Sequence, residues 1–317
     1  MPRILLVKTS SLGDVVHNFP VASDIAARVP GASIDWVVEE GFAGLPRLHR
    51  AVSRVIPLAI RRWRQSWWRA DTRREVSAFL DELRSMRYDA VIDTQGLFKS
   101  AIVARAAHGV RYGYDWSSAR EPLAPFYDRT FRVPRDAPAV ERNRTLASLA
   151  LSYAPPPAVD YGIASEAHSR LVRERYAVLV HATSAEAKLW PDERWAAVGN
   201  RLRSAGVRSL LPWGSPEEQR RSEKLSRSIE DAMIMPRRPL GDLTAVLADA
   251  ECVIGVDTGL THLAGALGTV TVGIYTATDP ALTGLYGCAR AANVGGRGQV
   301  PDADAVLREI ERLKGGG

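Results

Sequence analysis

The sequence lacks several features that assign a chain to a familiar class. It has only two cysteines, Cys252 and Cys288, which are too few for a disulfide framework and form no CxxC pair. No apolar run approaches the length of a membrane-spanning helix, and the N-terminal residues predict a strand rather than a signal peptide. We therefore expect an unprocessed cytosolic protein in which both thiols are buried or incidental.

Motifs for metal, nucleotide and nucleophile chemistry are also missing. The six histidines show no HExxH spacing, and no GxSxG elbow is present. The turn TSSLGD, residues 9–14, follows a predicted strand but contains neither GxGxxG nor GxxxxGKS/T. The one DxD, at residues 302–304, lies at the start of the last predicted helix, where it is typical of a cap. The sequence thus predicts neither a metal nor a cofactor.

What remains is the composition of an ordinary globular protein with a basic balance. Hydrophobic residues make up 46% and charged residues 25% of the chain, and a length of 317 residues favours two domains. The net charge of +6 and a pI of about 9.5 indicate an acidic partner. Nucleic acid, an anionic membrane surface and a phosphorylated substrate all fit that charge.

Short apolar strands alternate with helical segments along the whole chain, which is typical of parallel sheets wound with helices. The predicted strands are Ile4–Lys8, Ile34–Val38, Val55–Leu58, Ala90–Asp93, Arg129–Val133, Ala177–His181, Ser209–Pro212, Cys252–Val256 and Thr271–Tyr275. The predicted helices are Val15–Arg28, Arg73–Met86, Leu97–Ala107, Glu141–Ser152, Asp192–Ser204, Pro216–Ser228, Leu240–Ala248, Leu260–Ala266 and Asp302–Leu313.

A proline-rich stretch divides the chain. YAPPPAVDYG, residues 153–162, contains three consecutive prolines that neither a helix nor a central strand tolerates. We therefore predict an α/β protein with two doubly wound domains, 1–155 and 156–317, that face each other across a cleft. The last helix is a candidate to pack back on the N-terminal domain. Because ligands of such sheets bind outside the carboxyl ends of the strands, candidate site residues should follow the strands.

Asp14 follows the first strand and falls in the first turn of the next helix, directly after Gly13. One interpretation is a helix cap that complements the helix dipole. The other is a carboxylate at the edge of the cleft that acts as a general base, kept ionised by the positive end of the helix. The spacing alone leaves both open.

Three further turns follow strands in the second half. In DTGLTH, residues 257–262, the helix that starts near Thr258 offers free N–H groups to a phosphate, and His262 lies one helical turn on. HATSAEAKLWP, residues 181–191, brings hydroxyls and the cation of Lys188 that suit a diphosphate. WGSPEE, residues 213–218, offers a glutamate for ribose hydroxyls. A cap with a satisfied histidine, a solvated loop and a routine helix start are the respective structural alternatives.

Residues 61–74, RRWRQSWWRADTRR, contain six arginines and three tryptophans. Arginine pairs with phosphate or carboxylate, and tryptophan beside it suits a membrane interface or stacking on a ligand. A basic helix with buried tryptophan and a nucleic-acid patch are the alternatives. TQGLFKS, residues 94–100, and DWSSARE, residues 115–121, are expected to join this anionic-ligand site.

These stretches resemble the lipopolysaccharide heptosyltransferase I family over nearly the whole chain. The segments that carry the resemblance are VKTSSLGDVVH, WVVEEGF, VIPLAIRRWR, DTQGLFKSA, DWSSAREPLA, HATSAEAKLWP, LPWGSPEE and VDTGLTHLA. The resemblance implies a GT-B fold of two Rossmann-like domains. It also implies inverting transfer of L-glycero-D-manno-heptose from ADP-heptose to the first Kdo of Kdo2–lipid A, at the cytoplasmic face of the inner membrane.

The resemblance also implies a role for particular residues. Asp14 matches the general base, and Lys188 matches the group that stabilises the departing ADP. The implied donor-binding residues are Thr183, Ser184, Lys188, Glu218, Asp257, Thr258, Gly259 and His262. The implied acceptor-binding residues are Arg61, Arg62, Arg64, Gln95, Lys99 and Arg120. The implied partners are ADP-L-glycero-D-manno-heptose, Kdo2–lipid A and the anionic surface of the inner membrane, without nucleic acid.

Two other functions remain as alternatives. A heptosyltransferase that acts on a later core acceptor would keep the fold, although RRWR argues against it. A non-catalytic module that binds nucleic acid or another polyanion would explain the basic charge but gives DTGLTH no purpose.

Overall fold

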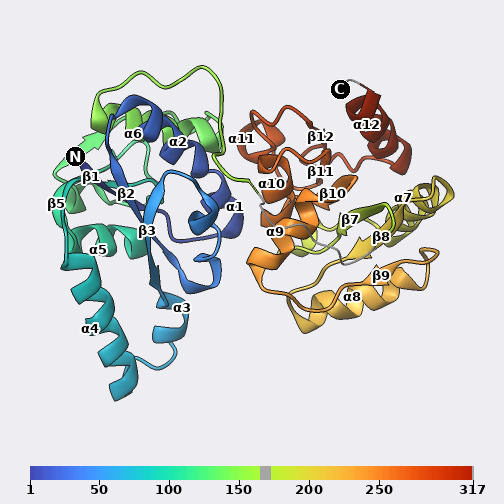
Figure 1. Ribbon diagram of the computed structural model, residues 1–317, viewed down its shortest axis with the longest axis horizontal. Helices are drawn as coiled ribbons and strands as arrows, with labels where there is room; N and C mark the ends of the chain where they lie inside the picture. The colour runs from blue at the N-terminus through green and yellow to red at the C-terminus, as the bar shows by residue number, and fades with distance from the viewer. Residues whose placement is uncertain (165–172, 316–317) are drawn as a thin grey trace. The chain divides into compact units, whose positions relative to one another are not determined.

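The computed structural model describes residues 1–164 and 173–315, which form two compact units, Met1–Ile163 and Ala164–Gly317 (Figure 1). The division therefore falls after Ile163, later than the expected boundary at residue 155. In the described residues, no helix combines the length and the apolar character that crossing a membrane requires.

The N-terminal unit is built on one parallel sheet with the strand order β3-β2-β1-β4-β5-β6. Its strands are β1 Arg3–Val7, β2 Ser33–Glu39, β3 Val52–Leu58, β4 Arg87–Asp93, β5 His108–Tyr114 and β6 Arg129–Phe131. Its helices are α1 Leu12–Val16, α2 Phe19–Arg28, α3 Ile60–Trp63, α4 Ala70–Arg84, α5 Phe98–Ala106 and α6 Ala139–Leu151, with short 3-10 turns η1 Glu40–Phe42, η2 Pro46–Leu48 and η3 Ala124–Phe126.

The C-terminal unit repeats the same arrangement, with the strand order β12-β11-β10-β7-β8-β9. Its strands are β7 Tyr176–Val180, β8 Arg208–Leu211, β9 Met233–Ile234, β10 Cys252–Val256, β11 Thr271–Tyr275 and β12 Ala291–Gly295. Its helices are α7 Asp192–Ser204, α8 Pro216–Ser226, α9 Leu240–Ala248, α10 Gly259–Ala266, α11 Pro280–Thr283 and α12 Ala303–Gly315, with the 3-10 turn η4 Glu186–Lys188.

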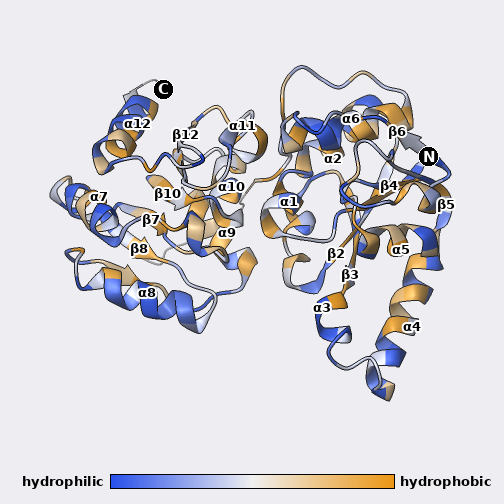
Figure 2. Ribbon diagram, turned by 180° about the vertical axis from the view of Figure 1, so that it is seen from behind, coloured by the Kyte–Doolittle hydropathy of each residue, from blue (hydrophilic) through white to orange (hydrophobic). Residues whose placement is uncertain are grey.

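Both sheets follow the order 3-2-1-4-5-6 when their strands are numbered within each unit, which is the Rossmann order. The expected α/β class with two doubly wound domains is confirmed. Each central strand is buried on both faces, so it reads as a continuous apolar run rather than an alternating one. Figure 2 shows this hydrophobic character along the central strands, whereas the outer faces of α7 and α8 are polar.

Each unit has a hydrophobic core of its own. The N-terminal core includes Leu5, Val37 and Val91 of the central strands, and the C-terminal core includes Trp190, Trp195 and Ile254. Helix α12 contributes Val306, Ile310 and Leu313 to the C-terminal core, where it packs against α7, β11 and β12. Asp302 accepts a hydrogen bond from the N–H of Ala305, so the expected capping role of the DxD is confirmed.

The predicted helix Val15–Arg28 is wrong, because the structure has two helices there. Helix α1 ends at Val16, and α2 begins at Phe19 with Asn18 as its N-cap and Pro20 in its first turn. Pro20 has no N–H to donate to Val16, and its ring would clash with that carbonyl in a continuous helix.

Strands β5, β9 and β12 were not expected from the sequence. Strand β5 carries Gly109 and Gly113, and Gly113 is required because a Cβ there would lie 2.3 Å from the ring of Tyr127. Strand β9 has two residues, and β12 is the edge strand of its sheet. Their pairing in the sheet, rather than a strong local propensity, makes these segments strands.

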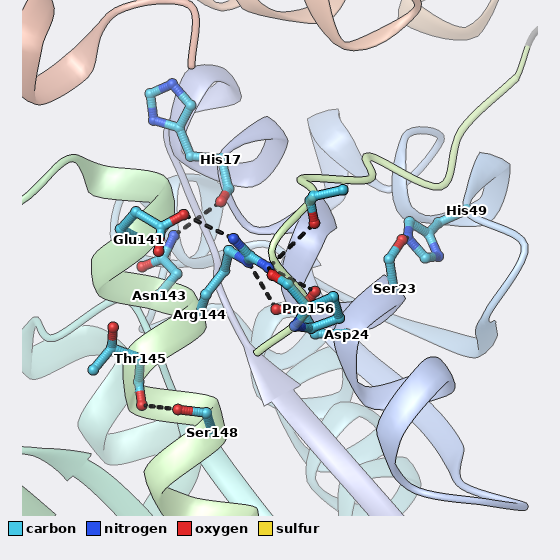
Figure 3. Close-up of polar contacts among 11 residues, drawn as sticks. His17, Ser23, Asp24, His49, Glu141, Asn143, Arg144, Thr145, Ser148 and Pro156 are labelled. Atoms are coloured by element: carbon cyan, nitrogen blue, oxygen red, sulfur yellow. Dashed lines mark hydrogen bonds and ion pairs between the residues drawn. The ribbon is translucent and has the colours of Figure 1, made fainter. Parts of the chain in front are cut away.

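The proline-rich stretch belongs to the N-terminal unit because Arg144 of α6 holds it there. The guanidinium of Arg144 pairs with Asp24 of α2 at 2.7 Å and also donates to the carbonyl of Pro156 at 2.5 Å (Figure 3). Both ionic side chains are almost fully buried. An uncompensated charge at such a site is costly, so removal of either partner would destabilise the unit.

Candidate active site

A pocket of about 170 Å³ lies at the carboxyl ends of β1 and β4 in the N-terminal unit. Polar side chains line it, among them the predicted site residues Asp14, Gln95 and Arg120. Ser10, which was not predicted, also lines it. The turn after β1 contains a cis peptide between Ser10 and Ser11. Among the predicted acceptor residues, Gln95 accepts from the N–H groups of Thr9 and Ser10, both at 3.1 Å.

Asp14 lies in the first turn of α1, as predicted, and its Oδ2 accepts from the N–H of Ser11 at 2.8 Å and from its hydroxyl at 3.1 Å. The capping role is thus confirmed. Both hydrogen bonds use the same oxygen, so capping does not involve Oδ1. Burial would raise the pKa of Asp14, but the charge of Lys8 and the bonds from Ser11 outweigh it and hold the pKa below its usual value.

Lys8 and Asn143 line the same pocket and were missed by the sequence analysis. The buried ammonium of Lys8 donates to the carbonyl of Thr94 at 2.9 Å and to Oδ1 of Asn143 at 3.4 Å. Burial lowers the pKa of Lys8, while the charges of Asp14 and Asp93 partly restore it. The only signal in the sequence is a lysine at the end of an otherwise apolar strand, which is an uncommon place for a buried charge.

Asn143 connects α6 to the pocket. Its amide donates to the carbonyl of His17 at 3.2 Å (Figure 3). Its Oδ1 also accepts from the hydroxyl of Tyr114 at 3.3 Å. One side chain therefore fixes the end of α1, the buried ammonium of Lys8 and a ring in the pocket wall.

The predicted acceptor cations divide into two groups. Arg120 is exposed at the pocket, and Lys99 donates to the hydroxyl of Ser10. Arg61, Arg62 and Arg64 lie on and after α3 and do not line that pocket. Arg62 is held by two carboxylates, Glu40 and Glu75.

In the C-terminal unit, the residues predicted to bind a donor meet around Asp257, which follows β10. Oδ2 of Asp257 lies 2.8 Å from the ammonium of Lys188 and accepts from the hydroxyl of Thr278 at 2.6 Å. Oδ1 lies 3.3 Å from Nε2 of His262. Burial would raise the pKa of Asp257, but the bonds from His262, Lys188 and Thr278 outweigh it, so the pKa is held far below its usual value.

Four more of the predicted donor residues, Thr258, Gly259, Thr183 and Ser184, lie on the two segments that meet at this cluster. Thr258 is the N-cap of α10 in extended conformation, its side chain makes no capping bond, and Gly259 is the first helical residue. Thr183 lies beside the cluster, 3.5 Å from the carbonyl of Asp257, and Ser184 is exposed in the same loop. The first turn of α10 therefore starts near Lys188 and the hydroxyl side chains of Thr183 and Ser184. Its free N–H groups and this cation are a suitable environment for a diphosphate.

Glu218 has a structural role in this conformation. Its Oε2 accepts from the N–H groups of Gly214 at 2.6 Å and Ser215 at 3.3 Å, while Ser215 accepts from the N–H of Glu218. This capping box starts α8. The neighbouring Glu217 is exposed and pairs with Arg220, so the two glutamates make different contacts.

The part of the chain that the structure describes contains neither a cluster of metal ligands nor a disulfide. No group of three or more His, Cys, Asp or Glu side chains is gathered there as for a metal ion. Neither Cys252 nor Cys288 forms a disulfide, and burial raises the pKa of Cys252 to about 12, which leaves it an unreactive thiol.

Known proteins with the same sequence pattern are heptosyltransferases. Lipopolysaccharide heptosyltransferase 1 of Escherichia coli K12 is 46% identical over 290 residues, covering 90% of this chain and 91% of the relative. The enzyme of that name from Pseudomonas aeruginosa is 45% identical over 289 residues, covering 90% and 81% of the two chains.

Solved structures agree with this similarity. E. coli heptosyltransferase WaaC with ADP superposes with a TM-score of 0.89 and 42% identity, over 98% of this chain and 99% of that one. The same enzyme with ADP-2-deoxy-2-fluoro heptose gives a TM-score of 0.85 over the same shares. Residues 76–309 also match the model of glycosyltransferase family 9 (heptosyltransferase). The chain therefore belongs to glycosyltransferase family 9 and has the GT-B fold of two Rossmann-like units.

Proposed function

We propose that this glycosyltransferase moves L-glycero-D-manno-heptose from ADP-heptose to the first Kdo of Kdo2–lipid A, with inversion at the anomeric carbon. The identity to the lipopolysaccharide heptosyltransferase 1 enzymes supports the reaction, and the analogue bound by WaaC supports the donor. The observation in this chain that carries the proposal is Asp14, a pocket carboxylate whose lowered pKa keeps it ready to accept a proton.

The reaction needs one base and no enzyme nucleophile. The acceptor hydroxyl oxygen forms a bond to the anomeric carbon of heptose while the bond from that carbon to the diphosphate oxygen breaks. The hydroxyl proton passes to Asp14, and ADP leaves with the bonding electrons. A single displacement of this kind inverts the configuration, and a positioned base contributes typically 10²–10⁴-fold to the rate.

The donor binds to the cluster around Asp257 in this proposal. Lys188 and the N–H groups at the start of α10 offset the charge of the departing ADP, which agrees with the 2.8 Å contact that already places Lys188 in the cluster. Thr183, Ser184, Thr258, Gly259 and His262 contact the diphosphate, Asp257 contacts the heptose and Glu218 the ribose. Because protein groups supply the positive charge, the proposed reaction uses no metal and no cofactor.

The acceptor is anionic, and cations of the N-terminal unit suit it. Kdo carboxylates and lipid A phosphates are the proposed ligands of Arg61, Arg62, Arg64, Gln95, Lys99 and Arg120. Because that acceptor is a membrane lipid, the enzyme is proposed to work as a peripheral protein on the anionic cytoplasmic face of the inner membrane. Nucleic acid is not a proposed partner.

The test is transfer by purified protein given ADP-heptose and Kdo2–lipid A in the presence of a chelator. Asp14→Asn preserves the shape of the side chain and removes the proton acceptor. We expect that variant to bind ADP-heptose as the wild type does and to lose at least about 100-fold in turnover. Asp81→Asn, an exposed change on α4, is the matched control and should keep full activity.

Substantial turnover by Asp14→Asn would contradict the role of the base. Transfer only to an acceptor that already carries heptose would favour the later-core alternative. Salt-dependent binding of nucleic acid without transfer would instead favour a polyanion-binding protein.

A further inference from the structure

Residues 64–74, the loop that joins α3 to α4 together with the start of α4, carry two of the most exposed aromatic side chains in the protein. We call this segment the Arg/Trp loop. Trp67 is 69% exposed and Trp68 is 60% exposed. Figure 1 shows the loop projecting past the end of β3 at the far end of α4, as an outermost part of the N-terminal unit. Large exposed indoles on a projecting loop are unusual for a surface that meets only water.

The loop is held in shape by its own contacts. Trp63, just before it, packs its ring 5.6 Å from that of Phe79 and donates to Glu75. Within the loop, the hydroxyls of Ser66 and buried Thr72 lie 2.9 Å apart, and Arg73 donates to the carbonyl of Trp68 at 3.0 Å. One indole thus anchors the loop while the next two face outward, so their exposure is built into the fold.

The charge of the loop is strongly positive. RQSWWRADTRR contains four arginines and one acid, which gives a net charge of +3. The acid, Asp71, pairs with Arg74. Within the described residues, Arg64, Arg69 and Arg73 form no ion pair with a carboxylate. These three exposed arginines therefore flank the two indoles in the sequence, and no carboxylate of the described residues pairs with them.

We propose that the Arg/Trp loop docks on the surface of an anionic phospholipid bilayer. Indoles settle at the level of the lipid headgroups, where their apolar ring leaves water and the ring N–H stays hydrated. Arginines beside them pair with lipid phosphates, and each basic group near such a surface adds about fivefold to binding. A projecting tip enters a headgroup layer, whereas proteins that bind single-stranded nucleic acid without sequence preference present a basic groove.

This inference deepens the proposed function, whose acceptor is a membrane lipid, but it can be tested without catalysis. The loop brings the unit to the membrane, and the indoles themselves have no part in the transfer. Docking by Trp67 and Trp68 is therefore separable from the pocket around Asp14.

The experiment measures sedimentation of the full chain with vesicles of phosphatidylcholine and phosphatidylglycerol that contain no acceptor. The variant Trp67→Ser/Trp68→Ser should bind these vesicles at least about tenfold more weakly than wild type. Quenching of tryptophan fluorescence by bromine-labelled lipid should fall in the same variant. Wild-type binding should weaken with added salt and with vesicles of phosphatidylcholine alone.

Trp116→Ser is the matched control. Trp116 is 64% exposed in the same unit, but its segment, residues 115–121, contains two acids and one arginine, in contrast to the Arg/Trp loop. We expect Trp116→Ser to bind vesicles like wild type. Because all three indoles are exposed, the variants should share the wild-type melting temperature, and Trp67→Phe/Trp68→Phe should retain part of the binding.

Several results would overturn the proposal. These are equal vesicle binding by wild type and the double variant, an equal loss in Trp116→Ser, and a preference for a single-stranded oligonucleotide over vesicles. A loss of turnover by the double variant on an acceptor stripped of its fatty acids would also overturn it, since the indoles would then act in the active site. A protein that docks but transfers no heptose would support the docking surface and sink the proposed function.

Discussion

At the scale of single residues, the two sites rely on carboxylates, Asp257 and Asp14, whose charges are stabilised in different ways. Asp257 is fixed by three direct partners, Lys188, His262 and Thr278. Asp14 accepts hydrogen bonds from the N–H and the hydroxyl of Ser11, and Lys8 acts on it as a charge in the same pocket. The first arrangement suits a binding group that keeps its charge. The second leaves a carboxylate that is ionised and still has an oxygen for a proton.

Removal of the charge of Lys8 should therefore change the titration of Asp14. In Lys8→Met the pKa of Asp14 rises, because the charge that opposes its burial is gone. We expect the acid limb of the pH profile of kcat/KM to move to higher pH, with the KM for ADP-heptose unchanged. The measurement is kcat/KM from acid to neutral pH.

An acid limb in the same place as in wild type would show that Lys8 does not tune the base. Thermal unfolding of Lys8→Met is the control for correct folding. It is needed because Met cannot donate to the carbonyl of Thr94, and loss of that hydrogen bond costs about 1–3 kcal/mol.

At the scale of elements, the donor residues depend on how closely α10 approaches β10. Gly255 lies in β10, and a Cβ built there would be 2.1 Å from Oγ1 of Thr261 and 3.0 Å from Val180. Thr261 in turn donates to the carbonyl of Val256 at 2.7 Å. The glycine thus lets the first turn of α10 lie against the end of its strand, next to Asp257.

Gly255→Ala should push this turn away from the strand. We expect a loss of about 1–3 kcal/mol in unfolding free energy from overpacking, together with weaker binding of ADP. Isothermal calorimetry and denaturant unfolding measure the two effects. The matched control is Gly241→Ala in α9, where a Cβ meets nothing within 4 Å, and it should be neutral or slightly stabilising. Unaltered ADP binding by Gly255→Ala would contradict the role of the close approach.

At the scale of the whole molecule, a buried histidine in each unit, His49 and His181, has a pKa well below its usual value. Nδ1 of His49 accepts from the N–H of Ala51, so Nε2 carries the proton that faces Ser23 at 3.1 Å (Figure 3). His181 lies 2.9 Å from Ser222 through Nε2, and its buried Nδ1 has no partner among the described residues. Burial is the main cause that lowers the pKa of each to about 4, and nearby arginine charge adds to it.

These two histidines should make the protein sensitive to mild acid. The unfolded chain takes up protons near pH 6.5, whereas the folded chain does so only near pH 4. The unfolded state therefore binds more protons in this range, and stability falls as the pH drops from 6.5 to 4. We expect a loss of up to roughly 3 kcal/mol for each histidine, measured by denaturant unfolding across that range.

His49→Gln and His181→Gln should flatten this dependence, while His108→Gln, a change at an exposed histidine, should leave it as in wild type. A wild-type unfolding free energy that is constant from pH 6.5 to 4 would contradict the prediction.

The sequence by itself determined the architecture and most turns of the site. Apolar runs at a regular spacing predicted most of the strands, and Asp14 and DTGLTH could be placed after strands because parallel sheets bind ligands at those ends. Pro20 also marks the break before α2 in the sequence. The apolar pattern of residues 15–28 nevertheless led us to predict one continuous helix. These features depend on local propensity and spacing, which the sequence displays directly.

Only the tertiary structure decided which side chains meet. Lys8 and Asn143 are 135 positions apart, and no local pattern links them. The strand order places β1 beside β4 and α6 over the same pocket, so the charge that tunes Asp14 arises from the packing. The same holds for the Arg/Trp loop, where the fold packs partly buried Trp63 against Phe79 and leaves Trp67 and Trp68 exposed. Burial and long-range pairing set these properties, and both exist only once the chain has folded.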